Sequence, residues 1–235
     1  ARSVVVLDEV QTLPSHLLAP VLSVCRELKA NYGTSFVFST ATQPAFRRSA
    51  ALPDGFVPGE TQEIAGDDAA ISKTFQALNR VRYERLGTLN WKSIAARMAG
   101  DSQVLCVVNT RGHAFTLWEN LRDALPKEQR DSVFHLSSAL CAEHRFDVLG
   151  RVVTPQEGSI RYRLQNKLPC RVVSTQLVEA GVDLDFPAVL RAMGPLDSIV
   201  QAAGRCNREG KLPYGRVGIF VPTDGGTPPG VYKTA

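Results

Sequence analysis

Several features that mark other classes of protein are missing from this 235-residue chain. No apolar run approaches the roughly eighteen residues of a membrane-spanning helix, so we expect no contact with a membrane. The five cysteines are far apart, without C-x-x-C or Cys/His metal-ligand spacing. This favours buried thiols in a reducing cytoplasm over disulfides or zinc. The first residues, ARSVVVLDEV, contain neither an initiator Met nor a signal-peptide pattern, and we expect the chain to derive from a longer one.

The composition is that of a globular protein, but its charge is unevenly divided. Apolar residues make up 44% of the chain and charged residues 21%, both ordinary values. Residues 1–70 carry five Lys/Arg and eight Asp/Glu, a net charge of −3 in a chain of net charge +4, which leaves +7 on the remainder. A basic second part is compatible with a polyanionic partner, although this excess does not identify one.

The start of the chain has the pattern of a strand, a helix and a second strand. Residues 3–7 form a short continuous apolar run, typical of a parallel strand buried on both faces. Residues 14–31 have helical periodicity, and Gly33 is a suitable helix stop. Residues 35–38 predict a second buried strand. The order predicts a βαβ unit whose strand ends share the sheet edge at which ligands bind.

A second and longer α/β series follows a change of composition. Residues 52–70 are rich in Pro, Gly and acidic side chains, which predicts a surface loop approaching a domain boundary. Residues 81–86 alternate weakly and predict a connecting strand. The later strands are predicted at residues 103–108, 132–136, 171–174, 189–193 and 216–221, and the helices at residues 91–98, 112–125, 142–149 and 196–206. The sequence thus predicts half of one α/β sheet followed by a complete one.

Polar clusters follow both strands of the first unit. Asp8 and Glu9 could bind Mg²⁺ through one carboxylate and polarise a water molecule through the other. A lone Asp-Glu pair is more often a solvated strand end, but a cluster of small hydroxyl residues follows the next strand. There Ser39, Thr40 and Thr42 could sense the acidic pair, while Thr42 could equally be a helix N-cap before the proline.

Similar clusters follow two strands of the second sheet. Asn109 and Thr110 lie between a buried strand and a helix, where backbone N–H groups and hydroxyls hold phosphate well. A simple helix N-cap is the alternative, and the two roles are compatible. Thr175 repeats the arrangement, and Gly181 and Asp183 add a flexible backbone and an acid. Two such loops on one sheet edge predict a track for a nucleic-acid backbone, read without sequence specificity.

The segment of residues 196–206 predicts a helix that leads into two arginines. With helical spacing, Gln201, Arg205 and Arg208 would share one face. Gly204 removes a side chain where a ligand could approach closely. Such a face suits an anion, and a solvated helix face with incidental arginines is the alternative.

Together these segments resemble motifs II to VI of superfamily 2 helicases, and more specifically the CRISPR-associated helicase-nuclease family of type I CRISPR systems. The segments that carry the resemblance are LDEVQTLP (7–14), FSTATQPAF (38–46), VVNTRGHA (107–114), HLSSALCAEHR (135–145), STQLVEAGVDLDFP (174–187) and LDSIVQAAGRCNREG (196–210). They span nearly the whole chain in the family's order. Position 11 departs from the pattern, because this sequence has Gln11 where a DEAH box has His.

The resemblance implies a cytoplasmic prokaryotic motor with two RecA-like domains that hydrolyses ATP in the cleft between them and moves along single-stranded DNA. It divides the chain into the C-terminal part of the first domain (1–70), a linker region (71–90) and the second domain (91–235). It also implies a CRISPR surveillance complex as a partner.

The resemblance also assigns roles to particular residues. Asp8 resembles the Mg²⁺ ligand and Glu9 the residue that activates water. Couplers of nucleotide state to DNA grip are implied at Gln11, Ser39, Thr40 and Ala41, with Gln11 also bound to the nucleotide. Contacts to the DNA backbone are implied at Asn109, Thr110 and Thr175. Contacts to the nucleotide are implied at Gly181, Asp183 and Gln201. Arg205 and Arg208 resemble arginines that reach the γ-phosphate, where other systems gain about 10³–10⁵ in rate.

Two parts of the family's pattern do not occur in the sequence. No G-K-[ST] is present, so the loop that cradles the β- and γ-phosphates is missing. No adjacent His-Asp pair is present, so the metal-dependent nuclease domain is not encoded. We therefore expect a helicase fragment that is inactive without its upstream helicase and nuclease parts. A non-catalytic DNA-binding or partner-docking module is the alternative, and a related translocase acting on RNA is disfavoured by residues 174–210.

Overall fold

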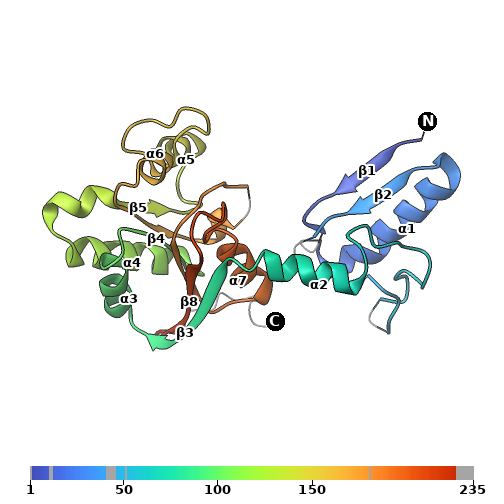
Figure 1. The fold of residues 1–235 in the computed structure, drawn as a ribbon, viewed down its shortest axis with the longest axis horizontal. Helices are drawn as coiled ribbons and strands as arrows, with labels where there is room; N and C mark the ends of the chain where they lie inside the picture. Colours follow the sequence, from blue (N-terminus) through green and yellow to red (C-terminus); the bar gives the residue numbers. More distant parts are fainter. Residues whose placement is uncertain (1, 11–12, 41–45, 51, 180, 226–235) are drawn as a thin grey trace. The chain divides into compact units, whose positions relative to one another are not determined.

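The computed structural model describes residues 2–10, 13–40, 46–50, 52–179 and 181–225. The chain divides into two compact units, Ala1–Ala77 and Leu78–Ala235 (Figure 1). The division falls inside the region predicted as a linker. In the described ranges, no helix is both long and apolar enough to cross a membrane.

Unit 1 contains the predicted strand–helix–strand arrangement. Strand β1 (Val4–Leu7) pairs in parallel with β2 (Ser35–Phe38), and helix α1 (Ser15–Tyr32) joins them. Gly33 ends α1 in the left-handed conformation at φ +66°, and its N–H donates to Lys29 O at 3.1 Å. Glycine adopts the left-handed conformation without a steric cost, and the predicted helix stop at Gly33 is confirmed.

The prediction that β1 is buried on both faces is wrong. Val4 and Val6 are 67% and 60% exposed, whereas Val5 and Leu7 between them are half-buried. Side chains alternate between the two faces of a strand, so β1 has one covered and one open face. A continuous run of apolar residues cannot distinguish these two cases.

Within unit 1, the segment that follows β2 packs onto β2 and α1 through aromatic rings and one ion pair. The rings of Phe38, Phe46 and Phe56 form a cluster with centroids 5.5–6.5 Å apart. Arg26 of α1 pairs with Glu60, with 2.6 Å between Nε and Oε1. The pairing, together with the hydrogen bond that Val57 N–H donates to Glu60, lowers the pKa of Glu60 to about 2. Helix α2 (Asp68–Ala77) follows.

Unit 2 is built on a parallel sheet whose described strands have the order β3-β8-β7-β4-β6-β5. The strands are β3 (Val81–Leu89), β4 (Gln103–Val107), β5 (Val133–Leu136), β6 (Cys170–Ser174), β7 (Ala188–Ala192) and β8 (Gly215–Pro222). The helices and turns between them are α3 (Trp91–Ala99), α4 (Arg111–Ala124), η2 (Lys127–Ser132), α5 (Ala142–Leu149), α6 (Ile160–Gln165), η3 (Gln176–Val178) and α7 (Leu196–Ala203). The predicted connecting strand at 81–86 is therefore β3, an edge strand of this sheet.

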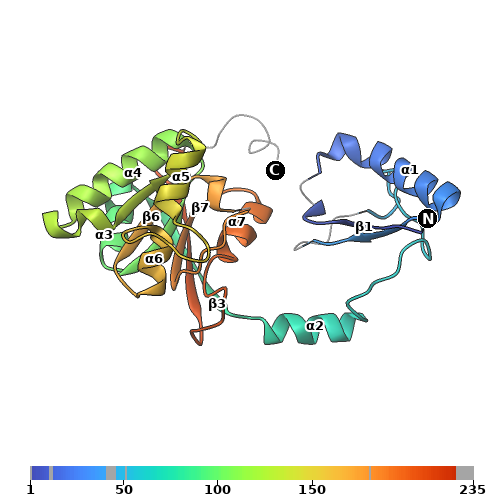
Figure 2. The ribbon, with the colours of Figure 1, turned by 90° about the horizontal axis from the view of Figure 1, so that it is seen from above.

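Helices cover both faces of the unit 2 sheet (Figure 2). One core cluster joins α3 and α4 to residues such as Val104 and Cys106 of β4. A second cluster joins α6 and α7 to Leu105 and Val107 of the same strand. Alternate side chains of β4 thus enter opposite cores, which explains why the central strands read as continuous apolar runs. The carboxyl ends of all the strands meet at one edge of the sheet.

Candidate functional site

The acidic pair of unit 1 lies where β1 ends. Asp8 and Glu9 are exposed, and Glu9 has a left-handed backbone with φ 51°. Glu9 N–H donates to Asp8 Oδ1 at 3.0 Å. Ser39 N–H donates to Leu7 O at 2.8 Å, and Ser39 O accepts from Val10 N–H at 3.2 Å. The structure therefore brings the acidic pair and the Ser39–Thr40 segment together at one sheet edge, as the sequence predicts.

These carboxylates fit the coordination chemistry of Mg²⁺ in a nucleotide site. Mg²⁺ in such sites takes one or two protein carboxylates and completes its shell with water and phosphate oxygens. Asp8 presents an exposed carboxylate, and the described residues contain no group of three or more His, Cys, Asp or Glu side chains that would hold a metal by itself. Two further predicted residues, Gln11 and Ala41, lie outside the described residues.

At the carboxyl edge of the unit 2 sheet, the structure places Asn109, Thr110 and Thr175 after adjacent strands. Thr110 is the N-cap of α4 and accepts a hydrogen bond from His113 N–H at 3.1 Å, so the N-cap role is confirmed. Thr175 is buried, and its N–H donates to Leu136 O at 3.1 Å.

Asn109 is turned into the protein at the same edge. It is buried and donates from Nδ2 to Met193 O at 2.7 Å. Its Oδ1 accepts a hydrogen bond from Arg191 at 2.7 Å. The amide therefore holds neighbouring strand ends together in this structure.

Gly181 and Asp183 lie on the long loop between β6 and β7. Gly181 has φ +70°, a conformation in which a residue with a Cβ would be strained. Asp183 is exposed and pairs with Arg208, with 2.8 Å between Oδ1 and Nε. Arg208 is also held by its backbone N–H, which donates to Asp185 Oδ1 at 2.7 Å. The structure thus brings Asp183 and Arg208 into direct contact.

The predicted helical stripe of Gln201, Arg205 and Arg208 is wrong, because α7 ends at Ala203. Beyond this point the chain leaves the helix to form a parallel bridge between Phe186 and Cys206. Gln201 lies in α7 and is half-buried.

Asn207 keeps the chain from returning to a helix after α7. It adopts the left-handed conformation at φ 47°, and its amide bonds to Arg80 O and to both backbone groups of Leu212. Arg205 and Arg208 consequently have very different surroundings. Arg205 is buried and donates to Val178 O at 2.8 Å and to Glu179 O at 2.6 Å.

Two buried charged residues, Arg191 and Glu179, lie near the loops after β4 and β6 and were not predicted as site residues. Arg191 of β7 is completely buried, and Glu179 is 7% exposed. The distance from Arg191 Nε to Glu179 Oε1 is 3.2 Å. Burial raises the pKa of Glu179, and the Arg191 charge opposes that rise. A charged residue inside the apolar run AVLRAM was the signal available in the sequence.

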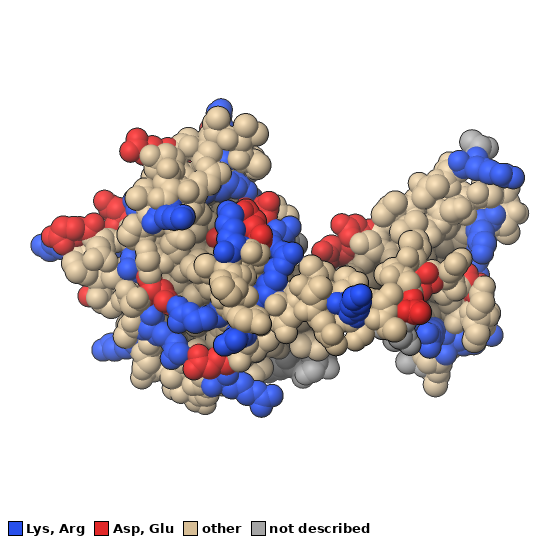
Figure 3. All heavy atoms as spheres, in the orientation of Figure 1, with Lys and Arg blue, Asp and Glu red and all other residues tan. Residues whose placement is uncertain are grey.

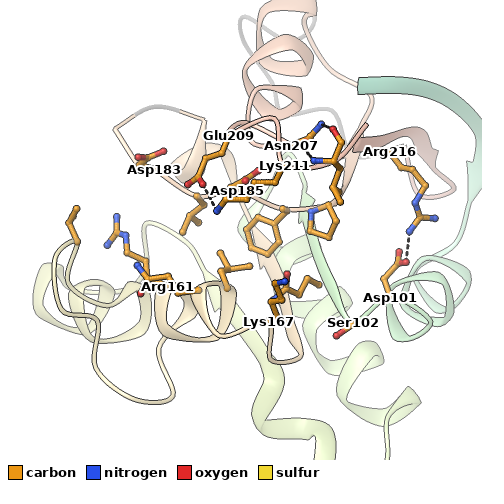
Figure 4. A pocket seen from close by; sticks show the side chains of 18 residues that line it. Asp101, Ser102, Arg161, Lys167, Asp183, Asp185, Asn207, Glu209, Lys211 and Arg216 are labelled. Atoms are coloured by element: carbon orange, nitrogen blue, oxygen red, sulfur yellow. Dashed lines mark hydrogen bonds and ion pairs between the residues drawn. The ribbon is translucent and has the colours of Figure 1, made fainter. Parts of the chain in front are cut away.

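A hollow of about 1010 Å³ lies near the other edge of the sheet, where β4, β7 and β8 begin (Figure 4). Among its charged side chains, Arg216 pairs with Asp101 and Lys211 with Glu209. Asp183 lines this hollow. Asp183 therefore lies near the edge where the strands begin, whereas the loops that carry Asn109 and Thr175 lie at the edge where the strands end.

A parallel sheet covered by helices on both faces, with polar loops at its carboxyl edge, is a doubly wound α/β arrangement of the kind found in RecA-like domains. Solved structures share this fold with the chain. The crystal structure of T. fusca Cas3-ATP has a TM-score of 0.62 at 19% identity and covers 93% of this chain and 29% of that chain. Mycobacterium smegmatis helicase Lhr bound to ssDNA and AMP-PNP has a TM-score of 0.58 at 14% identity, covering 94% and 28%. A chain of a CRISPR RNA-guided surveillance complex, pre-nicking, has a TM-score of 0.59 at 15% identity, covering 92% and 31%.

Sequence comparison finds similarity to one family of helicases. Residues 100–211 match the family model described as CRISPR-associated nuclease/helicase Cas3, C-terminal. The CRISPR-associated nuclease/helicase Cas3 of Methanothermobacter thermautotrophicus is 26% identical over 238 residues, 93% of this chain and 26% of that protein. That of Haloferax volcanii is 60% identical over 43 residues, 18% of this chain and 5% of that protein. The chain is therefore similar to the C-terminal portion of Cas3 proteins, and it spans about a quarter of the length of the Methanothermobacter relative.

Proposed function

We propose that this chain is part of an ATP-dependent helicase that moves along single-stranded DNA in CRISPR interference. The observation that carries the proposal is the match of residues 100–211 to the Cas3 C-terminal family. That range includes the loops after β4 and β6 and both candidate arginines. The relatives are much longer than this chain. We therefore propose that it carries some of the residues needed for the reaction and not all of them.

We assign nucleotide chemistry to the acidic pair of unit 1 and, separately, to one arginine of unit 2. ATP bound with Mg²⁺ would supply the phosphoanhydride bond that is cleaved. Asp8 would hold the ion through its exposed carboxylate, and Glu9 would orient the attacking water. Arg208, whose side chain is 47% exposed, would contact a γ-phosphate after leaving Asp183. The loop that cradles the remaining phosphates would come from outside this sequence.

We assign DNA binding to the carboxyl edge of the unit 2 sheet. Thr110 and the N-terminus of α4 offer donors suited to phosphate oxygens. Residues 78–235 carry 21 Lys/Arg and 15 Asp/Glu, a modest positive excess that would favour a polyanion. Lys and Arg lie in groups over unit 2 on the face drawn in Figure 3, with Asp and Glu between them. A CRISPR surveillance complex is the proposed partner.

Fluorescence anisotropy with a labelled single-stranded oligonucleotide tests the proposal on the 235-residue chain. We expect binding whose affinity falls steeply with salt, because phosphate contacts release counterions. We expect ATP hydrolysis at background level in the same samples. Thr110→Val keeps the shape of the side chain but removes its hydroxyl, and it should weaken DNA binding.

Two outcomes would contradict the proposal. Failure of the wild-type chain to bind single-stranded DNA at low salt would remove its DNA-binding role. Rapid ATP hydrolysis by this chain alone would show that no further phosphate-binding loop is needed. DNA binding that stays unchanged when ATP is added to the chain with its upstream part would favour a non-catalytic module.

A further inference from the structure

A buried ionic cluster lies among the segments that carry the candidate site. Arg191 has no exposed surface and extends from the central region of the sheet on β7. Its Nη1 donates to Asn109 Oδ1 at 2.7 Å and to Ala192 O at 2.6 Å, while its Nε lies 3.2 Å from Glu179 Oε1. One guanidinium thus connects the segments that follow β4 and β6.

The same cluster extends to α7 and to the arginine that follows it. Ser198 of α7 donates from Oγ to Glu179 Oε2 at 3.0 Å. Arg205 donates to the backbone carbonyls of Val178 and Glu179. The cluster therefore joins, through direct contacts, the chain segments that carry Asn109, Thr175 and the two candidate arginines.

Stability alone is a poor explanation for this pair. Burying two opposite charges has a desolvation cost that often exceeds their attraction, and well-packed apolar residues in their place are frequently as stable. Among the described residues, Arg191 Nη2 has no hydrogen-bond partner, and the 3.2 Å contact between Arg191 Nε and Glu179 Oε1 is an ion pair without hydrogen-bond geometry, so the pair is not fully satisfied. What these charged groups supply, and apolar groups do not, is directional hydrogen bonds to neighbouring segments, from Arg191 to Asn109 and from Ser198 to Glu179.

We propose that Arg191 and Glu179 are positioning residues, which fix the loop after β6 relative to Asn109 and Arg205 so that the DNA-contacting edge has one geometry. The proposal rests on the proposed function. Neither residue touches DNA or nucleotide in this role. Instead, both act through Asn109, Val178 and Arg205.

The test separates positioning from folding by means of a double variant. Arg191→Met or Glu179→Leu alone leaves one buried charge without its partner and should strongly destabilise unit 2. The combined Arg191→Met/Glu179→Leu variant has no unpaired charge, and its unfolding temperature should return close to the wild-type value. Its affinity for a single-stranded oligonucleotide should remain about two- to thirtyfold weaker, the range that such coupling typically covers.

Arg171→Met provides a matched control. Arg171 is another buried arginine of this sheet, but it lies at the opposite end of the strands and bonds to Met98 O, Ala99 O and Ser132 Oγ. We expect this variant to lose stability and to keep its DNA affinity. Glu179→Gln, which retains an acceptor for Ser198, should weaken DNA binding in a folded protein.

Three outcomes would contradict either the positioning role or the proposed function on which it rests. Wild-type affinity in the double variant would overturn the positioning role while leaving the proposed function intact. A double variant that does not fold would show that the pair serves the fold, which also overturns it. If the wild-type chain does not bind DNA, the proposed function itself fails.

Discussion

Arg205 and Arg208 are close together in the sequence but lie in contrasting surroundings. Arg205 is 8% exposed and holds two backbone carbonyls of the loop after β6. Arg208 is largely solvated and pairs with the exposed Asp183. An exposed guanidinium can move to a phosphate at little cost, whereas a buried one must first release its carbonyls. At the scale of single residues, this contrast makes Arg208 the better candidate for the proposed contact with nucleotide.

Substitution of each arginine by alanine should separate these roles. Arg205→Ala leaves two buried carbonyls unsatisfied, so we expect it to lower the free energy of unfolding of unit 2 by about 2–4 kcal/mol. Arg208→Ala removes an exposed ion pair and should cost less than about 1 kcal/mol. Urea denaturation measures both values. Equal effects of the two substitutions would contradict this division.

The pair of Arg26 and Glu60 predicts a dependence of unit 1 stability on pH. The pKa of Glu60 is lowered to about 2, first by the hydrogen bond from Arg26. A lowered pKa stabilises the folded state above the unfolded pKa of about 4.5, and this contribution disappears as pH falls toward 2. Glu60→Gln should therefore lower the unfolding temperature of unit 1 at pH 7, and the difference should shrink at pH 3. The exposed Glu27 lies next to Arg26 on α1. Glu27→Gln is therefore the control, because it removes a carboxylate and leaves the pair of Arg26 and Glu60 in place.

At the scale of elements, the turn after α7 and the start of β8 pack very closely. A Cβ on Gly215 would lie 2.5 Å from Cys206 Sγ and 2.9 Å from Asn207 Cβ. Gly215→Ala should therefore destabilise unit 2 by about 1–3 kcal/mol through overpacking. Gly112 in α4 has open space, with Thr110 Oγ1 at 3.9 Å as the nearest atom. Gly112→Ala should instead stabilise by about 0.5–1 kcal/mol. Thermal unfolding of both variants checks the opposite signs.

Most of the regular elements were predictable because their signals are local, although α2 and α6 were not predicted. Apolar runs bounded by polar residues identified the strands, and helical periodicity with Gly33 identified α1 and its end. The end of α7 was not predictable, since the residues that stop it act through partners distant in the sequence. Asn207 bonds to Arg80 O, and Cys206 bridges to Phe186. The exposure of Val4 and Val6 depends in the same way on neighbours that a single strand does not reveal.

The candidate site was predictable only as a set of segments. Loops after parallel strands meet at one edge, so the sequence indicated which segments lie near one another. It did not indicate which side chains face inward. Asn109 is buried against Arg191 although its pattern suggested an exposed contact. The apolar run around Arg191 was a local signal for its burial, whereas the burial of Glu179 depends on the packing of several segments.

At the scale of the whole molecule, the two units differ in how completely they enclose a core. Unit 2 has apolar clusters on both faces of its sheet. Unit 1 has a described sheet of two strands with exposed valines on one of them, and so small a sheet is marginal in isolation.

We therefore expect residues 78–235, produced alone, to unfold in one cooperative transition. Residues 1–77, produced alone, should show little hydrogen-exchange protection in β1. Guanidinium denaturation of the first fragment and hydrogen exchange of the second provide the measurements. A cooperative transition for residues 1–77 would show that two strands and α1 suffice.

The pairing of β3 with β8 has a consequence for the order in which the chain is made. β3 is the first strand of unit 2 to leave the ribosome, and its only neighbour in the described sheet is β8, the last. At about 5–20 residues per second, β3 would wait on the order of ten seconds for that neighbour. During this interval the rest of the sheet can assemble while β3 remains unpaired. Synthesis that stops before β8 would thus release a nascent chain with an open strand, which is a natural binding site for chaperones.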